Sequence, residues 1–415
     1  MAKSRILFIA PLPPPVHGSA MVSQYIKDSQ LLQSQHDCDF VNLSTSRRMD
    51  EIGKGGAKKL FRFVGSYFAV LFKLLTRRYD LCYLAITCHG MGFLKDAPFV
   101  LLCKLFGRKV LIHQHNKGMS RYVERWPYRW LLPLVYRHTK VMLLSWHLYD
   151  DISRVVKRDQ VVICPNGIPQ QSNVGPLPNP LPKRGNSGIA ANTKHYTLNT
   201  KQTKNENCHP NGVSAMSAAP SPSGEGWGEA TPHLLFLSNL IPSKGVYVLL
   251  DACRMLHEQG LSFVCDFVGG ETKEIDRATF DAAVKERGLE GIARYQGPKY
   301  GEEKERCFAE ADIFVFPTFY YNECFPLVLL EAMQYQLPLV STNEGGIPDI
   351  IQHGVNGYTV EREEAAPLAE ALAQLITHPT LRHEMGTAGY ARYKELYTLE
   401  AFERQFVSCL VSCER

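Results

Sequence analysis

Short apolar runs with the character of β-strands alternate with stretches of helical length along most of this 415-residue chain. The predicted strands are Arg5–Ala10, Cys38–Leu43, Asp80–Ile86, Lys109–His115, Lys140–Ser145 and Gln160–Cys164, then His233–Ser238, Ser262–Val268, Ile292–Gly297, Ile313–Pro317 and Leu337–Ser341. Three further helical segments start near Glu363, Thr380 and Leu399. Regular alternation of this kind is typical of βαβ units with parallel strands. The pattern predicts an α/β protein with two doubly wound parallel-sheet domains in tandem.

The composition changes between the two groups of strands. Residues 171–232 are rich in Pro, Ser, Asn, Gly and Thr and show no sustained periodicity. Loops longer than roughly 15 residues are uncommon inside compact domains, so we interpret this segment as a disordered insertion or linker. The predicted domains are therefore residues 1–170 and 233–395. We expect residues 396–415 to form a C-terminal helix that can cross back to the first domain.

The charge is divided unevenly between the two predicted domains. Residues 1–170 contain 25 Lys and Arg against 11 Asp and Glu, whereas residues 233–415 contain 16 against 27. A basic domain can face a nucleic acid, an anionic membrane or an anionic acceptor. No nucleic-acid-binding motif accompanies the charge, so no nucleic-acid partner is expected. A membrane surface or an anionic acceptor is favoured.

One basic segment of the first domain is also rich in aromatic residues. Residues 58–78 read KKLFRFVGSYFAVLFKLLTRR, and Trp126 and Trp130 lie farther along close to Arg125 and Arg129. A basic helix with aromatic residues can lie in a membrane interface. Alternatively, its apolar face simply packs on the sheet, as a βαβ helix must. Both interpretations remain open at this point.

The sequence also bears on the compartment. No stretch of 18 apolar residues is present, and the run Ile6–Ala10 is too short for a signal sequence. The 12 cysteines include no C-x-x-C pair, and no Cys/His spacing suits zinc. We expect a cytoplasmic protein with reduced, packed cysteines and no structural metal.

Two segments follow predicted strands and open predicted helices. Residues 11–21 place Gly18 at a helix amino terminus, where free N–H groups favour an anion, although a plain loop is equally consistent. Residues 238–246 place Lys244 in the first turn of a helix predicted from Ser243. A cation there opposes the helix dipole, so a facing phosphate would explain it, the alternative being a solvated lysine.

The most informative segment is ECFPLVLLEAM at residues 323–333, which follows a predicted strand and a loop. Pro326 suits the first position of a helix. Glu323 then lies in the loop before that helix, and Glu331 lies about two turns into it. Two carboxylates near one end of a helix can each accept hydrogen bonds from sugar hydroxyls. Gly345 and Gly346 form another tight loop after the next strand.

With these segments in view, the chain resembles the retaining glycosyltransferases of family 4, of the bacterial cell-surface polysaccharide type. The likeness covers most of the chain outside the insertion. The matching residues are Gly18, His113, His115, Pro165–Ile168, Lys244–Gly245, Gly269–Gly270, Gly297, Ala311–Asp312, Pro317, the pair Glu323 and Glu331, Ala332–Met333, Pro338, Gly345–Gly346 and Asn356–Gly357. The resemblance implies the GT-B fold, in which two Rossmann-like domains face a central cleft.

The resemblance also implies roles for individual residues in the second domain. Glu323 would bind hydroxyls of the donor sugar, Glu331 the nucleotide ribose, and Lys244 the diphosphate. Backbone amides near Phe325 and Leu327 would contact sugar or phosphate. The catalytic residues implied are Glu323 and Lys244, together with a histidine of the first domain.

That histidine is His115, which would reach the donor sugar or the reacting centre, with His113 as the alternative. Gly18 would let the first loop approach the donor phosphate. Two residues of the donor site depart from the family pattern. Asn239 stands where the family often has an arginine, and Pro326 stands where many members have glycine, which removes an N–H donor.

The function implied is transfer of a sugar, with retained configuration, from a nucleotide-sugar to a hydroxyl of a saccharide or lipid-linked acceptor. Such a transferase would work in polysaccharide or glycolipid synthesis in the cytoplasm, peripheral to the plasma membrane. No cofactor or metal is expected. Two alternatives remain: a nucleotide-sugar epimerase on the same fold, and a non-catalytic nucleotide-sugar-binding protein.

Overall fold

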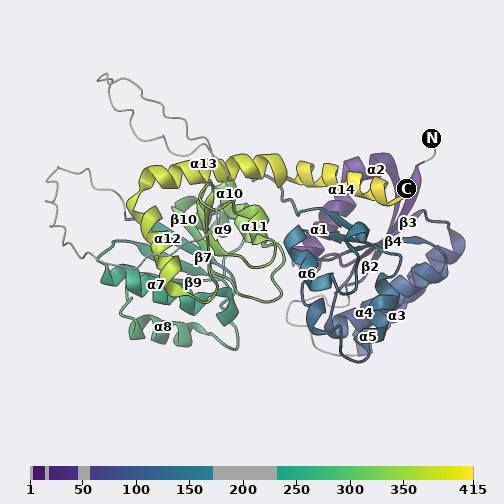
Figure 1. Ribbon diagram of the computed structural model, residues 1–415, viewed down its shortest axis with the longest axis horizontal. Coiled ribbons are helices and arrows are strands. Elements are labelled where there is room, and N and C mark those ends of the chain that lie inside the picture. The colour runs from purple at the N-terminus through teal and green to yellow at the C-terminus, as the bar shows by residue number, and fades with distance from the viewer. Residues whose placement is uncertain (1–2, 15–17, 45–56, 172–230, 415) are drawn as a thin grey trace, which may run out of the picture. The chain divides into compact units, whose positions relative to one another are not determined.

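The computed structural model describes residues 3–14, 18–44, 57–171 and 231–414 (Figure 1). The predicted insertion at 171–232 lies almost wholly outside these ranges. The described strands form two six-stranded sheets, and all neighbouring strands in them are parallel. The predicted fold class, α/β with two doubly wound parallel sheets, is confirmed.

The first sheet has the strand order β2-β1-β3-β4-β5-β6. Its strands are β1 (Ser4–Ala10), β2 (His36–Asn42), β3 (Leu81–Ala85), β4 (Lys109–His113), β5 (Lys140–Leu143) and β6 (Val161–Ile163). Side chains alternate across the sheet, so that Ile6 and Phe8 of β1 enter one hydrophobic cluster while Leu7 and Ile9 enter the other. The sheet therefore needs helices on both faces.

Three helices cover each face of the first sheet. The helices α1 (Gly18–Asp28), α2 (Gln30–Gln35) and α14 (Leu399–Glu414) contribute to the cluster that contains Phe8. The helices α3 (Ala57–Thr76), α4 (Gly90–Leu105) and α5 (Tyr128–Tyr136) contribute to the cluster on the opposite face. A short helix, α6 (Tyr149–Ile152), follows β5.

The second sheet has the strand order β12-β11-β10-β7-β8-β9. Its strands are β7 (His233–Leu237), β8 (Val264–Val268), β9 (Ala293–Gly297), β10 (Ile313–Phe316), β11 (Leu339–Thr342) and β12 (Gly357–Val360). The helices of this part are α7 (Val246–Glu258), α8 (Arg277–Glu286), α9 (Glu302–Glu310), α10 (Leu327–Gln334), α11 (Ile347–Ile350), α12 (Ala365–Thr377) and α13 (Pro379–Leu396). The sequence pattern did not indicate β12, a four-residue edge strand.

The last helix belongs to the second half by sequence and packs on the first sheet. The ribbon of α14 runs beside α2 over the first sheet's part of the chain (Figure 1). Its side chains Phe402, Phe406 and Leu410 are buried in the cluster that contains Phe8. The chain reaches this position through a parallel bridge between Ile168 and Thr398. A Cβ on Gly167 would lie 2.4 Å from the Thr398 carbonyl oxygen, so this close approach requires glycine.

Candidate active site

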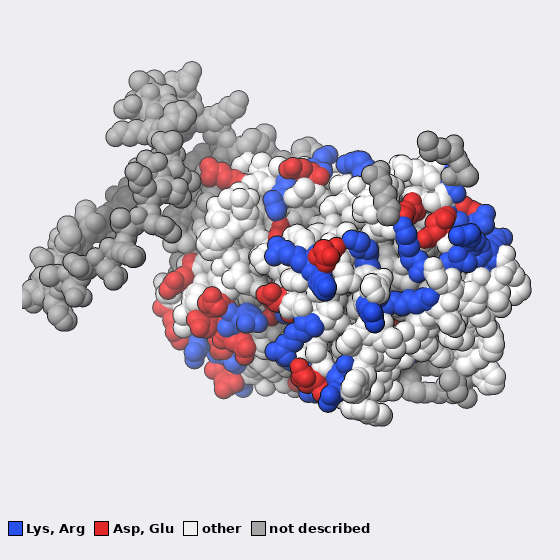
Figure 2. All heavy atoms as spheres, turned by 45° about the vertical axis from the view of Figure 1, so that its right-hand side comes forward, with Lys and Arg blue, Asp and Glu red and all other residues white. Residues whose placement is uncertain are grey.

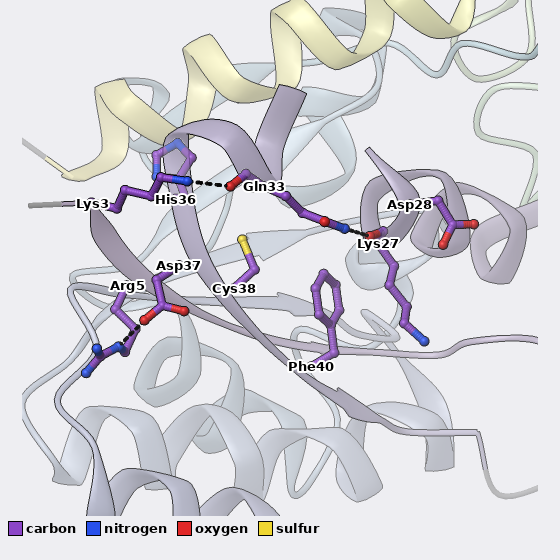
Figure 3. A pocket seen from close by; sticks show the side chains of 9 residues that line it. All are labelled: Lys3, Arg5, Lys27, Asp28, Gln33, His36, Asp37, Cys38 and Phe40. Carbon is purple, nitrogen blue, oxygen red and sulfur yellow. Dashed lines mark hydrogen bonds and ion pairs between the residues drawn. The ribbon is translucent and has the colours of Figure 1, made fainter. Parts of the chain in front are cut away.

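A hollow of about 800 Å³ lies at the amino-terminal ends of β1 and β2 (Figure 3). Several of its polar side chains already have partners: Arg5 Nε lies 2.7 Å from Asp37 Oδ2, and Lys3 Nζ donates to the Gln33 carbonyl at 2.9 Å. Ligands of open parallel sheets bind outside the carboxyl ends of the strands, which is the opposite end. This hollow is therefore not the candidate site.

A second cavity, of about 500 Å³, lies at the carboxyl ends of strands from both sheets. From the first sheet's part of the chain it is lined by Gly18, Ser19, His115, Leu144 and Asn166. From the second it is lined by Leu237, Ser238, Lys244, Lys304, Phe316, Asn322, Glu323, Cys324, Phe325, Pro326, Leu327, Val328 and Glu331. Eight of the nine residues predicted for catalysis or donor binding line this one cavity.

The structure corrects the predicted position of Lys244. It is the last residue of a 3-10 turn at Pro242–Lys244 and precedes α7, which begins at Val246. Gly245 separates the two elements with a φ of +89°, and a Cβ on it would lie 2.2 Å from the Pro317 carbonyl oxygen. Glycine is therefore needed here, because it lets the turn pack against the end of β10. That contact places the Lys244 side chain in the cavity.

Lys244 pairs with Glu323 across the cavity wall. The Lys244 Nζ lies 2.5 Å from Glu323 Oε2, and the two side chains are 14% and 12% exposed. The ammonium also lies 4.4 Å from the ring centroid of Tyr320, which is close enough for a cation–π contact. The predicted sugar-binding carboxylate and the predicted diphosphate-binding cation thus form one unit.

The double glycine at 345 and 346 supports the loop that carries Glu323. Gly345 has a φ of +57°, and a Cβ on it would lie 2.3 Å from the Glu323 carbonyl oxygen. The Gly346 amide donates to the Cys324 carbonyl at 2.6 Å. Only a loop without side chains can approach this closely, so these two glycines determine where the backbone of Glu323 lies relative to the cavity.

The amino terminus of α10 faces the same space. Pro326 is the N-cap and the helix begins at Leu327, one residue later than the sequence suggested. The Leu329 amide donates to the Pro326 carbonyl at 3.2 Å. The first amides of a helix have no acceptor within the helix, so those of Leu327 and Val328, both cavity-lining residues, are available to a ligand. The positive end of the helix dipole adds to their attraction for an anion.

Glu331 lies farther along α10 and has a partner that sequence reasoning missed. Its Oε1 accepts a hydrogen bond from Lys304 Nζ of α9 at 2.7 Å, and both side chains are partly exposed. Lys304 also lines the cavity. The carboxylate retains lone pairs that can accept further hydrogen bonds, while the lysine holds its orientation.

On the first sheet's side, the structure distinguishes the two candidate histidines. His115 lines the cavity, whereas His113 is fully buried beneath it, with Nδ1 2.6 Å from the Tyr83 hydroxyl. Burial, and secondarily the neighbouring His115, lowers the pKa of His113 well below its ordinary value. Gly18 opens α1, and a Cβ on it would make an ordinary 4.0 Å contact with Leu327. The space in front of Gly18 is therefore part of the cavity.

One asparagine predicted for the donor site lies outside the cavity, and another that was not predicted lines it. Asn239 does not line the cavity; its Oδ1 accepts a hydrogen bond from the Gly270 amide at 3.2 Å. Asn166, which was matched to the family but given no role, is 4% exposed and lines the cavity. Its Oδ1 has no hydrogen-bond partner among the described residues. A buried carbonyl oxygen of this kind is usually satisfied by water or a ligand.

Within the described ranges, the His, Cys, Asp and Glu side chains form no group of three or more that could hold a metal ion. The expectation of a metal-free reaction stays a prediction. The described helices also include none with the length and hydropathy needed to cross a bilayer.

Residues 221–392 match the family model of the glycosyl transferases group 1. A segment of 147 residues is 35% identical to the amylovoran biosynthesis glycosyltransferase AmsK of Erwinia amylovora, covering 34% of this chain and 35% of that protein. A segment of 168 residues is 30% identical to a D-inositol 3-phosphate glycosyltransferase of Pseudarthrobacter chlorophenolicus, covering 39% of this chain and 38% of that protein. The chain thus spans little more than a third of these relatives' length.

Solved structures share the fold over the whole chain. The apo form of the lipopolysaccharide outer core galactosyltransferase WaaB superposes with a TM-score of 0.66 at 15% identity, covering 98% of this chain and 99% of WaaB. Anabaena Alr3699/HepE in complex with UDP superposes with a TM-score of 0.65 at 14% identity, covering 99% and 100%. Residues 221–392 thus carry a glycosyl transferases group 1 domain, and the two-sheet architecture shared with these solved structures shows that the chain has the GT-B fold.

Proposed function

We propose that this protein transfers a sugar from a nucleotide-sugar donor to a hydroxyl of a saccharide or lipid-linked acceptor, with retention of configuration. The observation that supports it best is the convergence of Lys244, Glu323, Glu331 and the amino terminus of α10 on one cavity. Relatives named for amylovoran synthesis and for the lipopolysaccharide outer core favour a role in cell-surface polysaccharide or glycolipid synthesis.

The donor diphosphate fits the amino terminus of α10. Solved structures of HepE contain UDP or UDP-glucose, and we propose that this cavity takes a donor of the same class. Lys244 and the first amides of α10 would neutralise the diphosphate, while Glu331, held by Lys304, would bind the ribose hydroxyls. The lysine and the helix amides are held in place before the reaction begins, so they stabilise the negative charge that develops on the leaving diphosphate.

The sugar would lie between Glu323 and the first sheet's residues. Glu323 would accept hydrogen bonds from its hydroxyls while keeping its contact with Lys244. Asn166 Oδ1, which has no partner among the described residues, would accept another sugar hydroxyl, and His115 would face the anomeric centre. A sugar bound in this way explains why a buried amide oxygen on the cavity wall lacks a protein partner.

The bond changes balance without an enzymic nucleophile. The acceptor oxygen forms a bond to the anomeric carbon on the face that the diphosphate leaves. The electron pair of the broken carbon–oxygen bond departs with the diphosphate. The acceptor proton passes to a phosphate oxygen of the leaving group. The protein's part is to hold the acceptor hydroxyl beside the departing diphosphate on the same face of the anomeric carbon and to exclude water.

The remaining parts of the proposal are the location of the reaction, the region that binds the acceptor, and a reaction without cofactor or metal. We place the reaction in the cytoplasm, at the inner face of the plasma membrane, where lipid-linked acceptors are found. The first sheet's part of the chain would bind the acceptor, since it carries the excess of Lys and Arg. No cofactor or metal is needed, because the leaving-group charge is met by Lys244 and the amides of α10.

A thermal-shift screen of nucleotide-sugars tests the donor site, because a ligand that binds only the native state raises Tm. We expect one donor to raise Tm in the wild-type protein and to lose most of this effect in Glu331→Ala. That donor is then incubated with an oligosaccharide or polyprenyl-phosphate-linked acceptor, and the linkage is read by NMR. Inverted product would refute retention, an epimerised donor formed without acceptor would support the epimerase alternative, and binding without turnover would support a non-catalytic protein.

A further inference from the structure

The outward side of α3 is apolar, which is unusual for a helix on the surface of a soluble domain. Its inward side is packed on the sheet through Val70 and Leu74, which are buried. The opposite side exposes a second apolar row, with Phe61 79% and Phe72 66% exposed. The full row is Phe61, Val64, Phe68, Phe72 and Leu75. These spacings of three, four, four and three residues place them along one stripe of the helix.

The neighbouring helices extend this surface. The helices α3, α4 and α5 pack side by side on the same face of the first sheet, so their outward sides face the same way. Helix α4 exposes Leu105, and the segment around α5 exposes Trp126 and Trp130. We call the outward side of these three helices the α3–α5 face. Ten of the thirteen exposed large hydrophobic side chains among the described residues lie between positions 61 and 134.

The segment that carries the α3–α5 face is also strongly basic. Residues 57–137 contain fifteen Lys and Arg against three Asp and Glu. The Arg129 guanidinium lies 4.9 Å from the Trp130 ring centroid, so cationic and aromatic groups alternate on the outer side of α5. Figure 2, which brings the right-hand side of Figure 1 forward, shows blue Lys and Arg side chains beside a broad white area without charge. Monomeric soluble proteins rarely leave such an area uncovered.

We propose that the α3–α5 face binds the surface of an anionic lipid bilayer, with α3 and α5 lying in the interface. Phenylalanine and leucine side chains enter the acyl boundary, tryptophans lie at the headgroup level, and the surrounding Lys and Arg contact lipid phosphates. A second copy of the chain is a poorer occupant, because two faces with the same strong positive charge repel each other. The purpose of this contact rests on the proposed function, since it would bring the acceptor-binding part to lipid-linked saccharides.

The two interpretations that the sequence left open for residues 58–78 therefore both apply. One side of α3 packs on the sheet, as a βαβ helix must, through Val70 and Leu74. The other side remains exposed to solvent at Phe61, Phe68 and Phe72. One helix thus serves the core and carries a docking row.

The test uses the full chain and vesicles of phosphatidylcholine with or without phosphatidylglycerol, in a sedimentation assay at low salt. We expect the partition coefficient to be at least about tenfold higher for the anionic vesicles. The double variant Phe68→Ser/Phe72→Ser should lower it by at least about tenfold, because two rings no longer enter the interface. Tyr300→Ser is the matched control, since Tyr300 is 77% exposed in the second half of the chain and should leave binding unchanged.

A second measurement needs no variant on α3. Vesicles with brominated acyl chains should quench the tryptophan fluorescence of the wild-type protein, and Trp126→Phe/Trp130→Phe should remove most of this quenching. The proposal is overturned by an absence of quenching, by equal partition of Phe68→Ser/Phe72→Ser and wild type, or by a dimer in analytical ultracentrifugation that this variant dissociates while vesicles are not bound.

These assays distinguish a failure of the proposed membrane binding from a failure of the proposed sugar transfer. Phe68→Ser/Phe72→Ser should retain the thermal shift with the donor, whereas Glu323→Gln should retain vesicle binding and lose turnover. A protein that binds anionic vesicles through α3 but shows no shift with any nucleotide-sugar refutes the proposed function alone. A protein that transfers sugar but ignores the vesicles refutes the docking face alone.

Discussion

Replacing Lys244 by alanine is the most direct test of the site. The Lys244 Nζ lies 2.5 Å from Glu323 Oε2, on the wall of the cavity. One cation about 4 Å from a phosphate charge contributes on the order of 4 kcal/mol at an effective dielectric of 20. Since about 1.4 kcal/mol corresponds to a factor of ten, we expect kcat/KM to fall by about a thousandfold. Part of this loss should appear in KM, because the diphosphate is already charged in the bound donor.

The same substitution also acts on stability, and the two effects must be separated. It leaves the Glu323 carboxylate, which is 12% exposed, without its cation. An uncompensated group of this kind costs about 1–3 kcal/mol of folding free energy. The double variant Lys244→Ala/Glu323→Gln removes both charges. We expect it to recover most of the stability lost by Lys244→Ala and to recover none of the turnover.

The assay follows release of the nucleoside diphosphate from the donor found in the thermal-shift screen, at a temperature well below the Tm of every variant. Lys285→Ala, which changes an exposed lysine of α8, is the matched control and should behave as wild type. A loss of less than about fivefold in kcat/KM for Lys244→Ala would refute the electrostatic reasoning, since one tenfold step is only about 1.4 kcal/mol. Recovery of turnover in the double variant would show that neither the Lys244 ammonium nor the Glu323 carboxylate is needed for transfer.

Three further predictions concern the support of the site. Gly245→Ala should lower the free energy of unfolding by more than Gly288→Ala, because both glycines have positive φ but only Gly245 is close to the Pro317 carbonyl. In urea denaturation, Gly288→Ala should lower this free energy by about 1–2 kcal/mol, the cost of the left-handed backbone alone. Equal losses in the two variants would contradict the argument from the Pro317 contact. The free energy of unfolding should fall as pH drops below about 6.5, because His113 takes up a proton in the unfolded state but not when it is buried in the folded one. His113 can contribute at most about 1.4 kcal/mol per pH unit to the slope of unfolding free energy against pH, and this slope should be smaller in His113→Gln. An identical slope in the variant would show that His113 is not the cause of the pH dependence. Asn166→Ala should lower kcat/KM by about tenfold with little change in Tm, because it removes an amide oxygen that has no partner among the described residues. A large drop in Tm with unchanged kcat/KM would show instead that Asn166 stabilises the fold and does not bind substrate.

The alternation of apolar runs and helical stretches was sufficient to predict both sheets, because parallel strands buried on two faces are apolar along their whole length. It missed β12, whose four residues Gly357–Val360 begin with glycine and lie at a sheet edge. It also extended α7 back to Ser243, since propensity does not reveal the positive φ of Gly245. Both errors occur where a backbone approach, rather than a side-chain pattern, decides the local structure.

For the candidate site, local motifs predicted the groups and the fold supplied their partners. Glu323, Glu331 and the start of α10 are adjacent in sequence, so one segment was enough to propose them. The partner of Glu331, Lys304, comes from α9, and Asn166 comes from the other sheet's part of the chain. Such approaches depend on tertiary packing and cannot be obtained from spacing. The exposed row on α3 needed the structure for the same reason, since only packing shows which apolar side is used by the core.

The position of α14 has a consequence for biosynthesis. Phe402, Phe406 and Leu410 complete the cluster on the face of the first sheet that includes Phe8. During translation, the strands of the first sheet therefore keep part of that apolar face exposed to solvent until residues beyond Thr398 have left the ribosome. Neither half of the molecule is expected to be obtainable as an independent stable fragment cut between the two sheets, and a nascent chain stalled before residue 399 would present a natural substrate for chaperones.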